Sequence, residues 1–291
     1  MSSRATEAGI RTGSRTRQRV FSWVVGSIAV VVSLVVFVVP FAFIAVQALK
    51  TRQDANQLSF AWPEEIVLWQ NVVDTIQTRD YIVVTALINS TILTVASVTL
   101  MIIFAAMVGY VLQRRTTRWT GFINFLVLSG LIIPPAVVPT IWVLQGLGLF
   151  RTLTGMVFVE VAFGLSFSIL LFRAFMSTIP RELDEAATID GAGPLRVFFQ
   201  VIFPLLRSVV LTVIIVQSVV VWNDFVHPLY FLPGDDNATV QLTLYNFQSQ
   251  FSTQYNLLFT NILIITIPPL VVFLLFNRQI VGGFTTGAVK G

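Results

Sequence analysis

The chain is poor in the residues that most enzymes and metal proteins use for chemistry. None of its 291 residues is a cysteine, which excludes disulfides, thiolate metal sites and a cysteine nucleophile. His227 is the single histidine, so a zinc site built from several histidines is excluded. The only lysines are Lys50 and Lys290, and neither stands between a glycine and a serine or threonine, as a phosphate-binding loop requires. We therefore expect a chain that is not an enzyme, with no catalytic residue, no metal and no ATP hydrolysis of its own.

Charge is also scarce. Charged residues make up 11% of the chain and hydrophobic residues 55%, whereas soluble domains carry about 25% charged residues. This composition is typical of a protein that crosses the membrane several times and is surrounded by lipid. The net charge of +4 comes largely from arginines near the ends and in loops. Such arginines indicate orientation in the membrane, and we expect no nucleic-acid partner.

Long apolar runs account for most of what the chain does contain. Each is long enough to cross the hydrocarbon layer, and the predicted spans are about 20–49, 81–112, 121–144, 153–176, 209–232 and 257–276. The first run is too long for the core of a cleaved signal peptide. A basic tail, 1–19, precedes the spans, and a second tail, 277–291, follows them. The fold class expected is all-α and polytopic, with six transmembrane helices in one membrane unit from 20 to 276.

Prolines interrupt the third predicted span, at Pro134, Pro135 and Pro139. A proline inside a membrane helix is tolerated where neighbouring groups satisfy the carbonyls that it leaves without a donor. The pattern predicts a bent helix. A gating helix and a static kink both remain open.

Arginines fix the predicted orientation. Five of them precede the first span, and Arg114, Arg115 and Arg118 lie between the second and third spans. Positive residues gather on the cytoplasmic side, so both segments are predicted to be cytoplasmic. With six spans, the loop 177–208 and the C-terminus are then cytoplasmic as well.

The loop 177–208 is polar but carries the signals of ordered helices. Pro180 suits a first helical turn, and acidic residues follow it near the positive end of the helix dipole. Gly191 and Gly193 are expected to end that helix, and Pro194 can begin another. The sequence predicts a short helix, a glycine turn and a second helix between two membrane spans.

Three short motifs in this loop resemble the cytoplasmic loop of ABC importer permeases, which is written EAA, then G, then I-x-LP. They are Glu185-Ala186-Ala187, Asp190-Gly191 and Ile202-Phe203-Pro204, with Phe203 where the family usually has leucine. The sequences WNDF at 222–225 and GAVKG at 287–291 are similar to the carbohydrate-uptake branch, and to its smaller maltose-type permease in particular. The resemblance covers most of the chain from Asn89 onward.

The resemblance implies a permease subunit that translocates a sugar by alternating access across the cytoplasmic membrane of a bacterium. It implies as partners a dimer of ATP-binding subunits at the cytoplasmic face, a second and different permease, and an external solute-binding protein. ATP and magnesium would bind to the partner ATPases, and this chain would hold no cofactor. The loop would be a coupling helix that docks on the ATPase, through Glu185, Ala186, Ala187, Asp190, Gly191 and Pro204.

Two carboxylates fall within the predicted spans and require an explanation, because a charge inside the membrane is costly and usually faces protein or water. Glu160 lies in the fourth span and Asp224 in the fifth. With Trp222 and Asn223 they are candidates for the translocation path. The alternative is a carboxylate that pairs with a neighbouring helix or reaches the outer interface. His227 is interpreted as an interfacial histidine and not as part of a Ser–His–Asp triad.

Two other functions remain open. An ABC permease could carry a polyamine, phosphate or an amino acid, although the IDGAG context and the GAVKG ending favour a sugar. A membrane-embedded enzyme would need a concentrated set of polar catalytic residues at one membrane face. The sequence offers only the scattered Glu160, Asp224 and His227.

Overall fold

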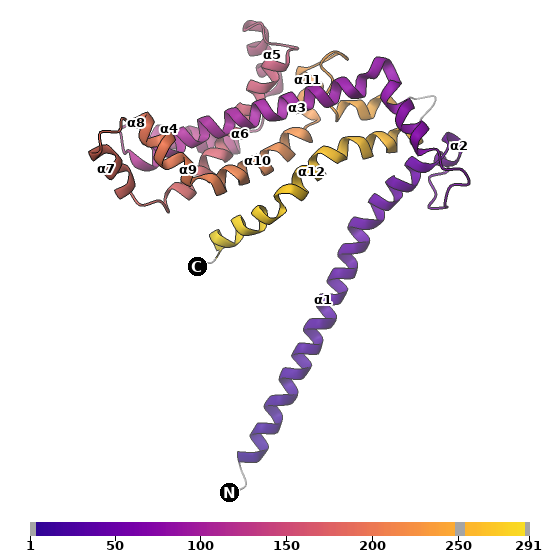
Figure 1. Ribbon diagram of the computed structural model, residues 1–291, viewed down its shortest axis with the longest axis horizontal. Coiled ribbons are helices and arrows are strands. Elements are labelled where there is room, and N and C mark those ends of the chain that lie inside the picture. The colour runs from indigo at the N-terminus through magenta and orange to yellow at the C-terminus, as the bar shows by residue number, and fades with distance from the viewer. Residues whose placement is uncertain (1–3, 248–253, 289–291) are drawn as a thin grey trace.

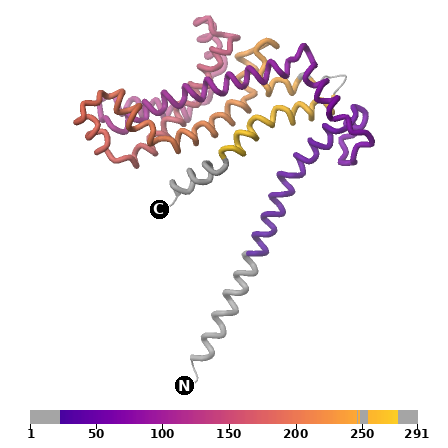
Figure 2. The backbone as a smooth tube through the Cα atoms, in the orientation of Figure 1, coloured from indigo at the N-terminus to yellow at the C-terminus, as the bar shows by residue number. Residues whose placement is uncertain are grey.

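A computed structural model describes the backbone of residues 4–247 and 254–288, and side chains from Trp23 onward up to Phe276 except at 246 and 248–253. Throughout this part of the chain the regular structure is helical (Figures 1 and 2). The predicted tails 1–19 and 277–291 lie outside the residues whose side chains are described. The α-helices are α1 (Arg4–Leu49), α2 (Arg52–Ala55), α3 (Leu68–Arg114), α4 (Thr120–Ile132), α5 (Val137–Gly146), α6 (Leu153–Met176), α7 (Glu182–Ile189), α8 (Pro194–Arg196), α9 (Phe203–Leu205), α10 (Arg207–Trp222), α11 (Val226–Phe231) and α12 (Tyr255–Ala288). A π-helix, η1 (Val197–Ile202), and a 3₁₀-helix, η2 (Leu242–Phe247), complete the order.

Four helices among the described residues are individually long and apolar enough to cross a membrane: α1, α3, α6 and α12. Two bent pairs bring the number to six when each pair counts as one span. The first pair is α4 with α5, bent by 117°, and the second is Pro194–Leu205 with α10, bent by 75°. The chain is therefore an all-α, multi-pass membrane protein with four to six spans.

The break between α4 and α5 falls where the sequence carries its paired prolines. Ile133 ends α4 in an extended conformation, and Pro134 and Pro135 lie between the two helices. Two successive prolines supply no N–H for a continuing helix. The third predicted span is thus two helices meeting at a sharp angle, and α5 projects away from the bundle (Figure 1).

A second break divides α3 just before the second predicted span. Arg79, Asp80 and Tyr81 all have positive φ, and Thr78 before them is extended. Residues with a side chain seldom adopt this backbone conformation. The break turns the chain from a short entry segment into the long apolar helix, whose expected start was Tyr81.

α3 and α6 pack against each other through small residues. A Cβ atom added to Gly109 of α3 would lie 3.1 Å from Cβ of Phe172 on α6, and one added to Gly164 of α6 would lie 2.6 Å from Sδ of Met101 on α3. Membrane helices approach closely where such residues meet. The α3–α6 contact forms the centre of the bundle, and α10 and α12 pack beside it.

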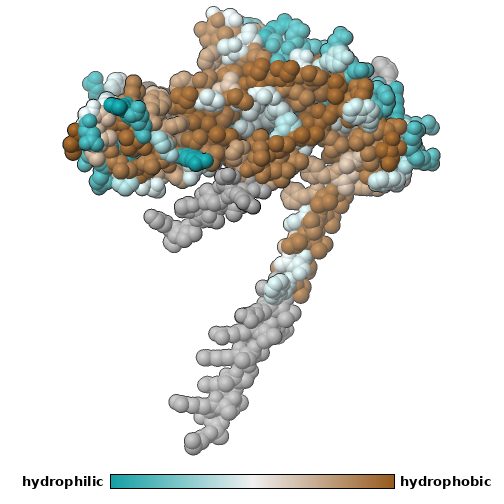
Figure 3. All heavy atoms as spheres, viewed as in Figure 1, coloured by the Kyte–Doolittle hydropathy of each residue, from teal (hydrophilic) through white to brown (hydrophobic). Residues whose placement is uncertain are grey.

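The fifth predicted span, 209–232, does not hold as one helix. α10 ends at Trp222, and a break at residues 223–225 separates it from the six-residue α11. Asp224 therefore lies in the break. The sequence analysis had placed it inside the fifth membrane helix, and that placement is wrong. On the face shown in Figure 3, hydrophobic residues cover the length of the bundle and hydrophilic residues gather at its two ends.

Candidate functional site

The loop between α6 and α10 forms a small helical cap at one end of the bundle (Figure 1). α7 begins at Glu182, two residues later than Pro180 suggested, and carries three acidic residues in its first turn. Gly191 follows the helix with φ of +81°, and Pro194 occupies the first turn of α8, as expected. Pro204 lies in α9, just before the 75° bend into α10.

Of the residues expected to couple this loop to an ATPase, five are exposed: Glu185, Ala186, Asp190, Gly191 and Pro204. Ala187 differs, because it is half-buried and packs on the core of its own chain. The most exposed large apolar side chains of this loop are Ile189 at 85% and Leu195 at 66%. The sequence reasoning missed both, although each lies two residues from a glycine of the turn, which was a visible signal.

Asp184 ties this cap to the end of α3. Its Oδ2 lies 2.9 Å from Nη2 of Arg114, and its Oδ1 accepts a hydrogen bond from the Tyr110 hydroxyl at 2.7 Å. The contact with Arg114 is a close ion pair and not a well-aligned hydrogen bond. Nη2 of Arg114 also donates to the carbonyl of Ile179 at 3.1 Å, and Arg181 donates to the carbonyl of Gln113 at 3.2 Å. The sequence offered no signal for this pairing beyond the basic cluster itself.

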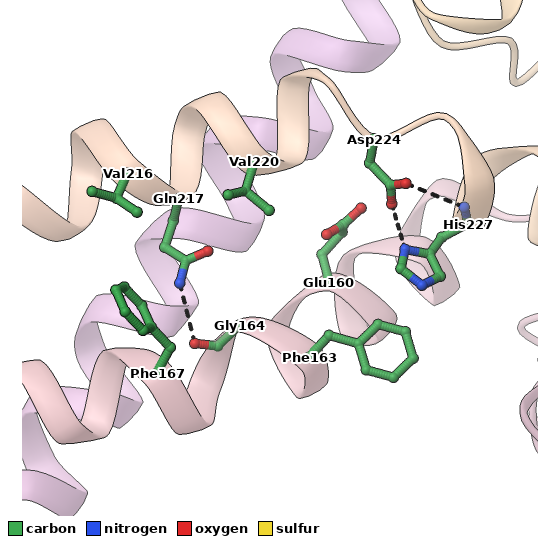
Figure 4. Close-up of a pocket in the computed structure, with 9 residues that line it drawn as sticks. All are labelled: Glu160, Phe163, Gly164, Phe167, Val216, Gln217, Val220, Asp224 and His227. Atoms are coloured by element: carbon green, nitrogen blue, oxygen red, sulfur yellow. Dashed lines mark hydrogen bonds and ion pairs between the residues drawn. The ribbon is translucent and has the colours of Figure 1, made fainter. Parts of the chain in front are cut away.

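The second candidate region is a cavity of about 440 Å³ between α6 and α10 (Figure 4). Glu160, Phe163 and Phe167 of α6 line it, together with Gln217 of α10 and Asp224 of the following break. Val216, Val220, Gly164 and His227 complete the lining. The structure thus brings together the two carboxylates that the sequence had singled out, from positions 64 residues apart (224 − 160).

Asp224 and His227 form a tight pair within this cavity. Oδ2 of Asp224 lies 2.6 Å from Nδ1 of His227, and Oδ1 accepts a hydrogen bond from the His227 backbone N–H at 3.2 Å. The imidazole contacts two aromatic rings: it is tilted against Phe163, with the centroids 4.7 Å apart, and stacked with Phe231, with the centroids 6.0 Å apart. His227 is therefore half-buried and partnered. The spacing of three residues between Asp224 and His227 was the sequence signal for this pair.

Glu160 completes the cluster but differs from Asp224. It is 4% exposed, and its Oε1 has no hydrogen-bond partner. One ligand-type atom from each of Glu160, Asp224 and His227 lies within 4.8 Å of the other two. No serine lines this cavity, which therefore holds no Ser–His–Asp triad among the described residues.

Trp222 and Asn223 do not line this cavity. The Trp222 indole Nε1 donates to the carbonyl of Ile265 on α12 at 3.0 Å. That carbonyl would receive the N–H of residue 269 in an unbroken helix, but residue 269 is a proline. Asn223 bonds to the Val219 carbonyl and to Gln241. Both residues therefore stabilise the packing around the break after α10.

Comparison with known proteins places this geometry in a family. Residues 87–284 match the family described as binding-protein-dependent transport system inner membrane component. The melibiose/raffinose/stachyose import permease MelC of Bacillus subtilis is 34% identical over 207 residues, which cover 70% of this chain and 75% of that protein. The diacetylchitobiose uptake permease NgcG of Streptomyces coelicolor is 29% identical over 260 residues, which cover 88% of this chain and 85% of that protein.

A solved structure shares the fold. One chain of a bacterial ABC transporter involved in the import of the acidic polysaccharide alginate superposes with a TM-score of 0.79 at 19% identity, covering 90% of this chain and 97% of that one. The match supports the all-α architecture, and the sequence match extends over the α7 loop and both cavity-lining helices. This multi-pass membrane chain therefore belongs to the family of inner membrane components of binding-protein-dependent transport systems.

Proposed function

We propose that the chain is one of two different permease subunits of a bacterial ABC importer for a sugar. The observation that carries the proposal is the family match across residues 87–284, together with relatives named for the import of melibiose, raffinose, stachyose and diacetylchitobiose. A solved alginate importer with the same fold is described in complex with a sugar-bound periplasmic protein. An external solute-binding protein is accordingly the expected donor of the sugar.

The α7 loop is the proposed contact with a pair of ATP-binding subunits. Its exposed surface combines Glu185 and Asp190 with the apolar Ile189 and Leu195, a mixture suited to an interface core with a polar rim. Its attachment to α3 through Asp184 would pass movement of the docked loop into the long central helix. A ligand shifts a conformational equilibrium only through contacts that differ between the two states, and this loop is where such contacts would form.

The proposed setting is the bacterial cytoplasmic membrane, with the α7 loop and both chain ends in the cytoplasm. The distribution of arginines supports this orientation. ATP and magnesium would be bound by the partner subunits. The coupling residues proposed are Glu185, Ala186, Ala187, Asp190, Gly191 and Pro204, with Ile189 and Leu195 added by the structure.

The experiment is co-purification of the tagged chain from its native host, followed by uptake assays in proteoliposomes. We expect an ATPase, a second permease and a binding protein to co-purify, and ATP-dependent uptake of a neutral sugar such as raffinose. Ala186 is exposed, so a tryptophan there should block the approach of the ATPase, and Ala186→Trp should abolish its capture. The matched Ala186→Ser stays small and should leave capture unchanged. Uptake of spermidine, phosphate or an amino acid instead of a sugar would overturn the substrate class. Full uptake by the Ala186→Trp complex would overturn the docking surface.

A further inference from the structure

The cavity between α6 and α10 has the chemistry of a sugar subsite. Its volume of about 440 Å³ falls within the range of about 300–1,000 Å³ that small-molecule sites occupy. Its wall is largely apolar, with the Phe163 and Phe167 rings on one side and Val216 and Val220 on the other (Figure 4). Apolar walls with a few convergent polar groups are the usual composition of a site that orients a small ligand.

Glu160 supplies the free polar group. The side chain is 4% exposed and lines the cavity beside Asp224, and its Oε1 is a buried oxygen without a hydrogen-bond partner (Figure 4). A buried polar atom without a partner costs about 1–3 kcal/mol. A rotation of the Glu160 carboxyl that exposes Oε1 to the cavity would let a ligand hydroxyl donate to it and recover this cost. A carboxyl oxygen accepts such a bond whether the group is ionised or protonated.

A metal ion fits this cluster less well. Both oxygens of Asp224 and Nδ1 of His227 are already used in the bonds between these two residues. A cation at the centre would keep only Glu160 as a free ligand unless that pair were broken. Zinc and similar ions in proteins take three or four protein ligands, so the geometry favours a ligand that needs one strong acceptor and an apolar wall.

The charge of the cavity limits which sugars it can accept. No arginine or lysine is among the described residues that line it, and His227 is paired with Asp224. An anion in this low-dielectric space would find no free basic residue, because the one histidine of the lining is already paired with Asp224. A uronate would find no positive partner here, whereas a neutral sugar would donate its hydroxyls to Glu160 and lay its C–H face on Phe167.

We propose that Glu160, Phe163 and Phe167 form a subsite for one ring of a neutral sugar on this chain, and that the lack of a free basic residue in the lining disfavours acidic sugars. Glu160 lies seven residues into α6 (160 − 153), or about 10 Å along the helix axis, on the side predicted to face out. The subsite would thus receive the sugar early in its passage. This inference rests on the proposed sugar-import function.

Because the chain has no native cysteine, a single introduced thiol reports on the cavity. The experiment uses the assembled transporter in nanodiscs, with Val220→Cys in the cavity wall and maleimide labelling of this chain followed by mass spectrometry. Ile92→Cys is the matched control, because Ile92 is exposed on α3 and is not among the residues lining the cavity. The probes are raffinose, which is neutral, and trigalacturonate, which is acidic.

We expect raffinose to slow labelling of Val220→Cys, trigalacturonate at the same concentration to leave it unchanged, and Ile92→Cys to respond to neither. Glu160→Leu, which keeps the volume but removes the acceptor, should raise the half-protecting raffinose concentration by about tenfold, the value of one good hydrogen bond. Glu160→Gln keeps an acceptor oxygen and should stay within about threefold. If Glu160→Gln keeps the raffinose protection that Glu160→Leu loses, the acceptor oxygen recognises the sugar. Equal loss in both variants would mean that residue 160 only fills space.

Several outcomes would overturn the subsite. Raffinose uptake by the wild-type transporter without protection of Val220→Cys would leave the proposed function standing and remove this inference. Equal protection by trigalacturonate would remove the charge selectivity, and protection by Zn²⁺ alone would make the cluster a metal site. Protection by raffinose without transport of any sugar would keep the subsite and overturn the proposed function.

Discussion

The α7 loop and the α6–α10 cavity differ in how they are built. The loop is a continuous stretch of chain whose proposed contact residues are mostly exposed at one end of the bundle (Figure 1). The cavity combines residues 64 positions apart, and its central carboxylate is almost fully buried. Substitutions of the exposed loop residues should therefore change function with little effect on stability, whereas substitutions around the cavity should change packing or affinity.

Ile189→Glu is the strongest test of the loop. Ile189 is 85% exposed, so the change should not disturb the fold of the isolated chain. If Ile189 is a central anchor on the ATPase, the charge should reduce ATP-driven uptake about a hundredfold, as substitution of an interface hot spot does. ATPase co-purification and proteoliposome uptake measure this, with Ile189→Leu as control. Normal uptake by the glutamate variant would show that this surface stays free of the partner.

Asp184→Asn tests the attachment of the loop to α3. The side chain keeps its size but loses the ion pair with Arg114. ATPase capture should persist while the sugar transported per ATP falls about tenfold. Removing one partner of a mostly buried ion pair costs several kcal/mol, and we expect part of this energy to be the energy that couples movement of the loop to α3. A double-mutant cycle with Arg114→Gln gives the interaction energy. Additive effects of the two changes would rule out the attachment.

Trp222→Phe examines the packing behind the cavity. It removes the indole N–H that serves the Ile265 carbonyl, which Pro269 leaves without a helical donor. We expect a loss of about 1–2 kcal/mol of stability, from one buried hydrogen bond. Thermal unfolding in detergent measures it. In the Pro269→Ala background a helical donor is available again, so Trp222→Phe should then cost clearly less.

Phe203→Leu should have the smallest effect. It restores the residue that the ABC permease pattern usually carries, and it removes ring contacts with Phe198 and Phe199, whose centroids lie 5.8 and 6.3 Å away. Aromatic pairs contribute about 0.5–1.5 kcal/mol each beyond area burial, and leucine retains part of the packing. Uptake should stay within about twofold. A large loss of uptake would mean that the bend into α10 depends on these rings.

Much of the fold followed from local sequence. The helix bounded by Glu182 and Ile189, the turn at Gly191 and the new start at Pro194 are set by acidic residues, glycine and proline within a few positions of each other. The bend after Ile133 follows from Pro134 and Pro135. In each place the determining interactions are between neighbours in the chain, so the pattern alone was sufficient.

The amino-acid pattern was sufficient for a helical membrane protein, for the bend at Pro134 and Pro135, for the order of short helices around Gly191, and for the family motifs. Three contacts depend on how the helices pack: Glu160 lies beside Asp224, Asp184 pairs with Arg114, and Trp222 points away from the cavity and donates to α12. The rotation and crossing of packed helices select these contacts. An apolar run specifies that a helix is buried in the membrane, but it does not specify which face of the helix meets which neighbour.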